Sequence, residues 1–191
     1  TPSNPVPFVS IAISADGEYI VAGDNGNVVY VFDKDSSTPV WTKTTHGNDV
    51  RSVALSADGE YIIVGTDDDI YLFDKDSSSP LWHISTVDEQ EKRSVTISAN
   101  GEYIVATHHS KVYLFDKDSS TPLWNYTAGD EVISVAISAD GKYISVGSDD
   151  DNVYTFKNSL ADRPSIIPYG PRSGSEVEDP VLRWFAGSDD R

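Results

Sequence analysis

Short apolar segments alternate with polar residues along most of this 191-residue chain. Residues 61–64 and 70–73 are typical, since each is a run of four apolar residues rich in β-branched and aromatic side chains. Such short runs favour strands, because a helix needs apolar residues recurring every three or four positions over a longer stretch. Asp58-Gly59 precedes one run and is a strong hairpin signal. The segment predicts four strands, at residues 53–55, 61–64, 70–73 and from Pro80 onward, and almost no helix.

This arrangement is repeated. The hairpin signal Asp16-Gly17 returns as Asp58-Gly59, Asn100-Gly101 and Asp140-Gly141, at spacings of 42, 42 and 40 residues. A second block follows each turn, reading VYVFDKDSSTPVW up to Trp41, IYLFDKDSSSPLW up to Trp82 and VYLFDKDSSTPLW up to Trp124. The fourth copy keeps only residues 153–156 of that block. Four strands in roughly 40–45 residues is the period of a β-propeller blade.

We therefore predict an all-β chain of four propeller-type blades, each of four antiparallel strands, with an extended C-terminal strand and tail. Residues 1–8 are an extended lead-in. The blades cover residues 9–168, divided at about 9–50, 51–92, 93–132 and 133–168, and residues 165–167 supply the last strand of the fourth. Residues 169–191 contain a Gly-, Pro- and Ser-rich linker and one more strand at 180–185.

The repeated segment resembles the WD-repeat family over roughly residues 9–157, with Phe32-Asp33, Phe73-Asp74 and Phe115-Asp116 where that family places Trp-Asp. The family's Gly-His pair is absent, and only the reversed His46-Gly47 comes near it. The buried His–Ser–Asp–Trp network of that family is therefore not expected to form as a set. Trp41, Trp82 and Trp124 lie one strand after the Phe-Asp pairs, and we expect them to fill gaps between blades instead.

Two further resemblances concern the surroundings of the repeats. The amino-acid sequence of the repeats is similar to that of repeat proteins of archaeal and bacterial cell surfaces, some with pyrroloquinoline-quinone-type propeller ancestry. The tail resembles the start of a fibronectin-III or immunoglobulin-like module, in which a buried Trp follows an early apolar pair. Because one strand cannot make a sandwich, this strand either opens a longer module or pairs elsewhere.

Charge and composition limit the partners. The formal net charge is −17, so phosphate backbones and anionic lipid surfaces are repelled, and nucleic acid is a poor partner. No apolar run approaches the roughly 20 residues of a membrane span, which argues against membrane insertion. The chain has no cysteine, which excludes disulfides and thiolate metal sites. It has no methionine either, so Thr1 is not a translation start and we expect a processed chain.

The repeated acidic turns are candidate calcium sites, because oxygen ligands at alternate positions are what a Ca²⁺ loop uses. The competing interpretation is a hairpin turn in which Asp and Ser cap backbone N–H groups, and it is favoured because the central glycine and distal glutamate of such a loop are absent. The runs 67–69 and 149–151 are a second cation candidate, against ordinary solvated loop charge. The candidate calcium ligands are Asp33, Asp35, Asp74, Asp76, Asp116 and Asp118.

No catalytic arrangement stands out, and we predict no enzyme activity and no cofactor apart from weak Ca²⁺ binding. Adjacent residues on a strand point to opposite faces, so His108 and His109 are a poor metal pair. The abundant serines follow the repeat, which indicates a structural role, and no Gly-x-Ser-x-Gly elbow exists. A carboxylate pair for glycoside hydrolysis would be expected at positions that break the repeat, and the acids that stand out there are Asp88, Glu89 and Glu91 in one loop. A quinone-dependent enzyme would need further Trp, Arg and Asn inside the ring.

Asn125-Tyr126-Thr127 is the one N-glycosylation sequon of the chain. It follows Trp124 on the outermost strand of a blade, where a glycan would face solvent. The cell-surface resemblance favours an extracellular or cell-surface location, and a glycan on Asn125 is more strongly expected there.

Four blades leave three arrangements open: part of a larger ring, a closed four-bladed ring, or an open arc that meets other copies. An exposed terminal blade presents an apolar face and unpaired edges, which drive association. We therefore predict a non-catalytic extracellular scaffold that binds proteins, including copies of itself, as oligomers or fibres. Val181, Trp184 and Phe185 are the candidate interface of the C-terminal strand, by strand addition. The alternatives are a ligand-binding or sensor propeller from a larger ring and, third, a hydrolase or quinone-dependent enzyme.

Overall fold

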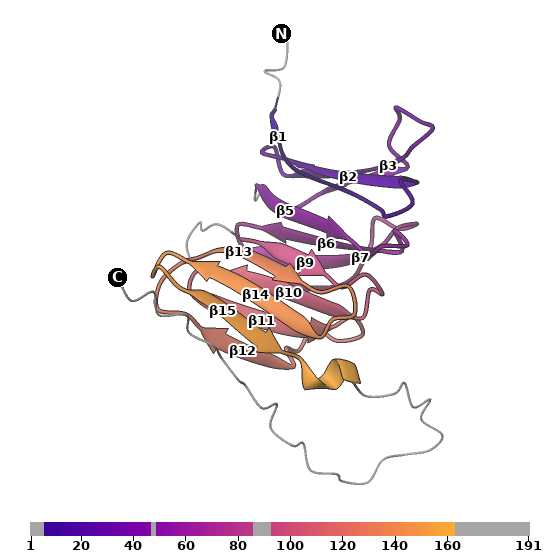
Figure 1. Ribbon diagram of the computed structural model, residues 1–191. Coiled ribbons are helices and arrows are strands. Elements are labelled where there is room, and N and C mark those ends of the chain that lie inside the picture. The colour runs from indigo at the N-terminus through magenta and orange to yellow at the C-terminus, as the bar shows by residue number, and fades with distance from the viewer. Residues whose placement is uncertain (1–5, 47–48, 86–92, 163–191) are drawn as a thin grey trace.

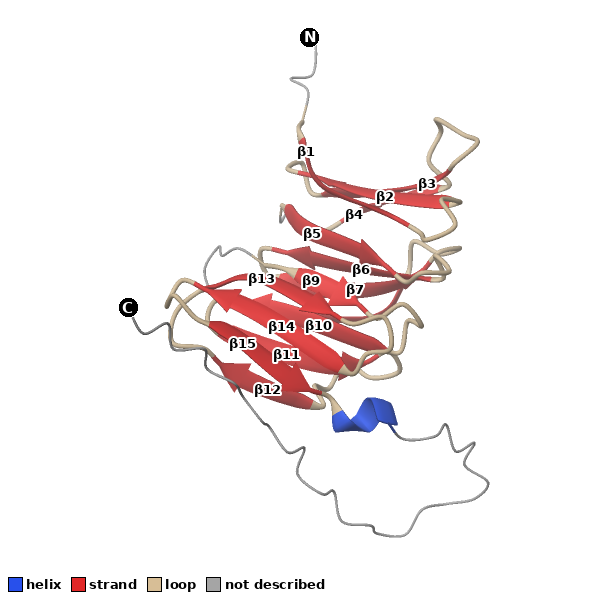
Figure 2. Cartoon of the chain, viewed as in Figure 1, coloured by secondary structure: helices blue, strands red, loops and turns tan. Residues whose placement is uncertain are grey.

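Residues 6–46, 49–85 and 93–162 are described by the computed structural model (Figure 1). Almost all regular structure in them is β-strand, as Figure 2 shows. Blade 1 comprises β1 (Phe8–Ile13), β2 (Tyr19–Asp24), β3 (Val28–Asp33) and β4 (Trp41–Thr44). Blade 2 comprises β5 (Val50–Leu55), β6 (Tyr61–Thr66), β7 (Asp69–Asp74) and β8 (Pro80–Ser85).

The second half of the chain continues the pattern. Blade 3 comprises β9 (Val95–Ile97), β10 (Tyr103–His108), β11 (Lys111–Asp116) and β12 (Trp124–Thr127). Blade 4 comprises β13 (Val132–Ile137), β14 (Tyr143–Ser148) and β15 (Val153–Lys157), followed by the 3-10 helix η1 (Ser159–Asp162). None of the helical structure in the described ranges is long and apolar enough to cross a membrane.

Each blade is one antiparallel sheet in which consecutive strands are neighbours. The predicted four-stranded blade is confirmed for blades 1 to 3, whereas the described part of blade 4 has three strands. The fourth strand predicted for it, at 165–167, lies outside the described residues, as does the C-terminal strand at 180–185. The lead-in is shorter than predicted at its end, because Phe8 already pairs with Asp24 as the first residue of β1.

The turn between the first two strands of every blade is built the same way. In blade 1 the Ser14 hydroxyl donates to Asp16 Oδ1 at 2.6 Å and accepts from the Tyr19 N–H at 3.0 Å. Gly17 takes a φ of 76°, which L-residues rarely adopt. The bond from Ser14 lowers the pKa of Asp16 below its ordinary value. The same bonds recur at Ser56, Ser98 and Ser138.

The blades stack face against face in chain order (Figure 1). We call the side of a blade that faces the preceding blade its leading face, and the side that faces the next blade its trailing face. The core consists of three apolar clusters, and each cluster joins two consecutive blades. Between blades 1 and 2, for example, Val21, Val29 and Val31 of the trailing face contact Val53 and Phe73 of the leading face.

Tryptophan at the outer strand fastens each blade to the next. The Trp41 ring lies 5.4 Å from the Phe73 ring, and its indole N–H donates to the Lys75 carbonyl at 2.6 Å. Trp82 repeats the ring contact with Phe115, at 5.6 Å, and Trp124 repeats it with Phe156, at 5.2 Å. The prediction that these tryptophans fill the gaps between blades is confirmed.

The hairpin glycines also take part in the stacking. A Cβ at Gly101 would lie 2.5 Å from the Tyr61 ring of the preceding blade, whereas a Cβ at Gly17 would meet nothing within 4 Å. Both glycines have nearly the same positive φ, 74° and 76°. The two positions therefore differ only in whether another blade covers them.

Alanine at these glycines should separate the cost of backbone strain from that of blade contact. Gly17→Ala should lower the free energy of unfolding by about 1–2 kcal/mol through strain at positive φ. Gly101→Ala should cost about 1–3 kcal/mol more, because its methyl group overpacks the Tyr61 ring. Urea unfolding of the two variants measures the difference, and equal losses would contradict the contact seen here.

Candidate functional site

The leading face of blade 1 is an apolar sheet surface with no blade on it in the described structure. Ile11 is 71% exposed, whereas Val53, at the same repeat position in blade 2, is 6% exposed. Phe8 is 61% exposed, whereas its equivalent Val50 is fully buried. The residues are therefore of the type that blades 2 to 4 bury. Ile13, Ile20 and Phe32 complete the face.

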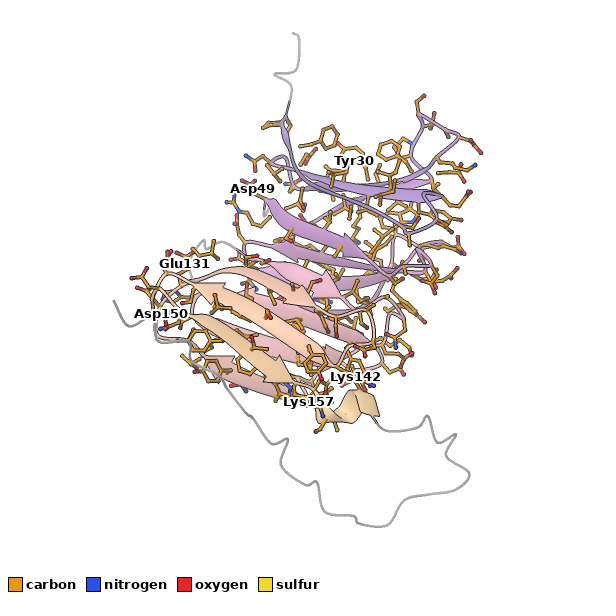
Figure 3. All side chains as sticks on the ribbon, in the orientation of Figure 1. Tyr30, Asp49, Glu131, Lys142, Asp150 and Lys157 are labelled. Atoms are coloured by element: carbon orange, nitrogen blue, oxygen red, sulfur yellow. The ribbon has the colours of Figure 1, made fainter. Side chains whose placement is uncertain are left out.

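This face is hollowed where other blades receive side chains of their neighbour. One hollow of about 400 Å³ lies between the first three strands, lined by Phe8, Ile11, Ile20 and Phe32 among others. A second of about 240 Å³ adjoins it and shares Ile11 and Ile20. Figure 3 shows Tyr30 on this outer side of blade 1, where its ring meets the Phe8 ring edge-on at 5.4 Å. The face is thus shaped for packing and has no polar group converging on a small-molecule site.

The trailing face of blade 4 is the second sheet surface on which no other described residues form a blade. Tyr143 is 53% exposed and Val153 is 69% exposed. Two central positions of this face are polar: Ser145 stands where blade 1 has Val21, and Thr155 stands where blade 1 has Val31. The two uncovered faces of the described stack therefore differ, since only the leading face of blade 1 is apolar at every central position.

The candidate calcium ligands lie in separate turns, one to each of blades 1 to 3. In blade 1, Asp33 Oδ1 accepts the Asp35 N–H at 2.9 Å, and Asp35 pairs with Lys34. Asp74 and Asp116 cap the N–H groups of Asp76 and Asp118 in the same way. Within the described ranges no group of three or more acidic or histidine side chains could hold a metal ion. The observed hydrogen bonds are those of the capping interpretation, and Ca²⁺ binding at these turns stays a prediction.

The acidic runs between the second and third strands are also used structurally. Asp67 is buried, and its Oδ1 accepts a charge-assisted bond from Arg51 Nε at 2.5 Å. Its carbonyl accepts from the buried Arg93 Nε at 2.8 Å. In blade 4, Asp150 accepts bonds from the Tyr154 hydroxyl and the Gly129 N–H. These carboxylates hold the ends of the blades together and are not arranged around an open cavity.

A buried polar cluster in blade 2 was not predicted. The Tyr71 hydroxyl donates to Asp69 Oδ2 at 2.8 Å, and Ser85 donates to the other oxygen of that carboxylate at 2.6 Å. His46 Nδ1 lies 3.3 Å from the Tyr71 hydroxyl, and Thr66 Oγ1 accepts the Asp69 N–H. Burial and then the Asp69 carboxylate raise the pKa of Tyr71 above its usual range. The cluster differs from the His–Ser–Asp–Trp network of the WD-repeat family, because the Tyr71 hydroxyl donates to the carboxylate and tryptophan takes no part in these bonds.

The remaining candidates lie apart. His108 is buried at the end of β10, while His109 is exposed in the following turn with a φ of 52°, so the pair does not converge. Asn125 is exposed on β12, an edge strand of its sheet, where a glycan has room. The interface candidates Val181, Trp184 and Phe185 and the loop acids 88–91 lie outside the described residues.

An apolar face on an exposed terminal blade is predicted from the sequence without its residues being named, although a signal for them exists. Position 11 aligns with Val53 and Val95, which blades 2 and 3 bury against their predecessors, and with Val135, which blade 4 buries in part. In the described structure no blade lies against the first copy of this position, and Ile11 is exposed there.

Comparison with known proteins supports the blade architecture. The family model described as outer membrane protein assembly factor BamB matches residues 5–138 and 67–161. No curated protein matches the chain. A chain in the crystal structure of a mitotic checkpoint complex is similar, with a TM-score of 0.67 and 16% identity over 78% of this chain and 49% of that chain. At this identity the likeness shows the fold alone, and the present chain spans about half of the matched one.

Removing the Tyr71 hydroxyl should destabilise the protein, because Oδ2 of the buried Asp69 carboxylate loses the donor it has in the described structure, while Ser85 still donates to Oδ1. We expect Tyr71→Phe to lower the free energy of unfolding by about 1–3 kcal/mol. Tyr113→Phe is the matched control, since Tyr113 occupies the same position in blade 3 and has no such carboxylate beside it in the described structure. Urea denaturation compares the two, and a loss for Tyr113→Phe as large as that for Tyr71→Phe would contradict the assignment.

Proposed function

This chain belongs to the family of the outer membrane protein assembly factor BamB, and we propose that it is a non-catalytic scaffold that works outside the cell. In this proposal it binds other proteins, and copies of itself, through its uncovered blade faces. The observation that carries the proposal is the leading face of blade 1, on which the apolar side chains of Phe8, Ile11 and Ile13 are exposed to solvent. A contiguous apolar surface of this kind marks an interaction site.

Several observations support interaction over catalysis. In the described structure the acidic residues of the loops form capped turns and ion pairs, and those of blade 2 also form a buried polar cluster, without a cavity that joins a nucleophile and a base. The uncovered hollows are lined by apolar side chains, with Ser10 as the one polar residue. The matching family is described as an assembly factor, and the similar solved chain comes from a protein complex. We therefore propose no enzymatic role and no cofactor for this chain.

The finer parts of the proposal concern location and the C-terminal strand. The exposed sequon at Asn125, the acidic surface and the family description support an extracellular or cell-envelope location. Val181, Trp184 and Phe185 would add a strand to a neighbouring sheet, which extends assembly beyond contacts between faces.

A second candidate is a ligand-binding propeller to which these blades contribute one part. The observation that favours it is that the chain spans 49% of the similar solved chain. In that case the leading face of blade 1 would be covered by further blades, and this chain would not associate with copies of itself.

Charge placed on the leading face of blade 1 should abolish self-association. We expect the wild-type chain to form oligomers that Ile11→Glu dissociates, because burying a carboxylate in an apolar contact is costly. Leu81→Glu is the control, since Leu81 is also exposed but lies on the outer strand of blade 2. Size-exclusion chromatography with light scattering measures the mass, and a wild-type monomer at high concentration would favour the ligand-binding alternative.

Glycosylation tests the proposed location. Protein purified from the medium or envelope of its own cells should carry a glycan on Asn125, visible as added mass on the peptide containing residues 124–127. Asn125→Gln should remove that mass and leave stability unchanged, because the side chain is exposed on an edge strand. Unmodified Asn125 in protein retained inside the cell would count against an extracellular scaffold.

A further inference from the structure

The tyrosines and glycines that lock consecutive blades together have unpartnered counterparts at the two uncovered faces. Tyr61 of blade 2 covers the hairpin glycine Gly101 of blade 3, and Tyr103 of blade 3 covers Gly141 of blade 4 in the same way. Tyr143 of blade 4 is the next tyrosine in this series and is largely exposed. Gly17 of blade 1 is the first glycine in the series, with open space beside it.

The two uncovered faces also carry a second complementary pair, a glycine on blade 4 and an exposed phenylalanine on blade 1. Gly23 on the trailing face of blade 1 makes room for Val50 of blade 2. Gly65 of blade 2 makes room for Val95 of blade 3, which stands at the repeat position of Val53 and not of Val50, so the first pair alone is the precedent for this match. Gly147 is the equivalent glycine of blade 4, and nothing lies within 4 Å of its Cβ position. Phe8 of blade 1 stands at the repeat position of Val50 and projects from the opposite uncovered face.

The backbone shows the same complementarity. The Ala15 N–H donates to the Ala57 carbonyl at 2.9 Å, Ala57 donates to Ala99 at 3.0 Å, and Ala99 donates to Ala139 at 3.0 Å. At the ends of this series, the Ala139 N–H and the Ala15 carbonyl have no blade beside them in the described structure. One uncovered face thus supplies the donor, and the other supplies the acceptor.

From these three matches we infer that two copies of this chain join head to tail, with the trailing face of blade 4 in each copy packed on the leading face of blade 1 in the other. The inference rests on the proposed self-association and names its geometry. Each junction would repeat the internal one: Tyr143 over Gly17, Phe8 over Gly147 and Ala139 donating to Ala15.

Two such junctions close a ring. Contacts between unlike faces either close or continue as a filament, depending on the rotation at each step. Two copies contribute eight blades, which is within the range of closed propellers and needs a rotation of about 45° per blade. The similarity to half of a longer propeller chain supports curvature of the kind that closes.

The junction is weaker than the internal contacts. Ser145 and Thr155 stand where the internal trailing faces bury Val, Ile or Leu, so their hydroxyls would enter an apolar contact. Two chains of net charge −17 also repel each other. Added salt should therefore strengthen the dimer, because it screens the repulsion and leaves the apolar contact intact.

The experiment compares charge on the two uncovered faces by sedimentation velocity of the full chain. Ile11→Glu blocks the leading face of blade 1, and Val153→Glu blocks the trailing face of blade 4; both residues are exposed, so folding should survive, as circular dichroism checks. Each variant alone should be monomeric where the wild type is a dimer. Mixing them should restore a 1:1 complex, because the intact trailing face of the Ile11→Glu chain meets the intact leading face of the other.

A gain-of-function variant completes the test. Ser145→Val combined with Thr155→Leu restores the aliphatic positions and should lower the dimer dissociation constant by roughly tenfold or more. The same pair added to the Ile11→Glu chain should tighten the mixed complex, which has only one intact junction. Leu81→Glu should behave as the wild type in every measurement.

The outcomes separate this inference from the proposed function. A Val153→Glu chain that still dimerises, or growth beyond two copies, would overturn the head-to-tail ring and leave self-association standing. A wild-type chain and a Ser145→Val, Thr155→Leu chain that both stay monomeric would overturn self-association as well. Dimers lost in both single variants and regained on mixing support the ring.

Discussion

Packing of one blade against the next is the interaction on which the whole structure depends. A four-stranded sheet of this size has apolar residues on both faces and cannot bury either of them alone. The three core clusters accordingly lie between blades, and each draws its residues from two consecutive repeats. The tryptophan that bonds to the next blade and the tyrosine that covers its hairpin glycine serve the same contact.

The same dependence explains why the uncovered apolar surface lies at the end of the described stack. Every repeat carries the residues of a buried face, including the first, which has no described neighbour to bury it. Val53 and Val50 are buried because blade 1 packs on them. Ile11 and Phe8 occupy the same repeat positions and are exposed, because no described blade packs on blade 1 from that side. At the other end, Ser145 and Thr155 make the trailing face of blade 4 more tolerant of water, so the two surfaces are unequal in apolar character.

The polar residues play a supporting part that is local to each blade. Serine and aspartate close the hairpins, the Asp-Lys-Asp turns cap their own backbone, and Asp67 and Asp150 accept bonds at the opposite ends of the blades. These carboxylates accept hydrogen bonds from backbone and side-chain donors, and among the described residues they do not gather in groups of three or more that could hold a metal ion. Their common effect is a negatively charged surface around apolar faces.

The sequence by itself determined the blades, because strand period, hairpin glycines and the 40–42-residue spacing are local properties that repeat. It also placed the tryptophans between blades and Asn125 on an outer strand. Only the tertiary structure decided which surfaces are left open, how Tyr71, Asp69 and His46 meet, and that the acidic turns do not gather. Those features depend on residues from different strands or blades coming together, and their distances in space cannot be read from the spacing along one repeat.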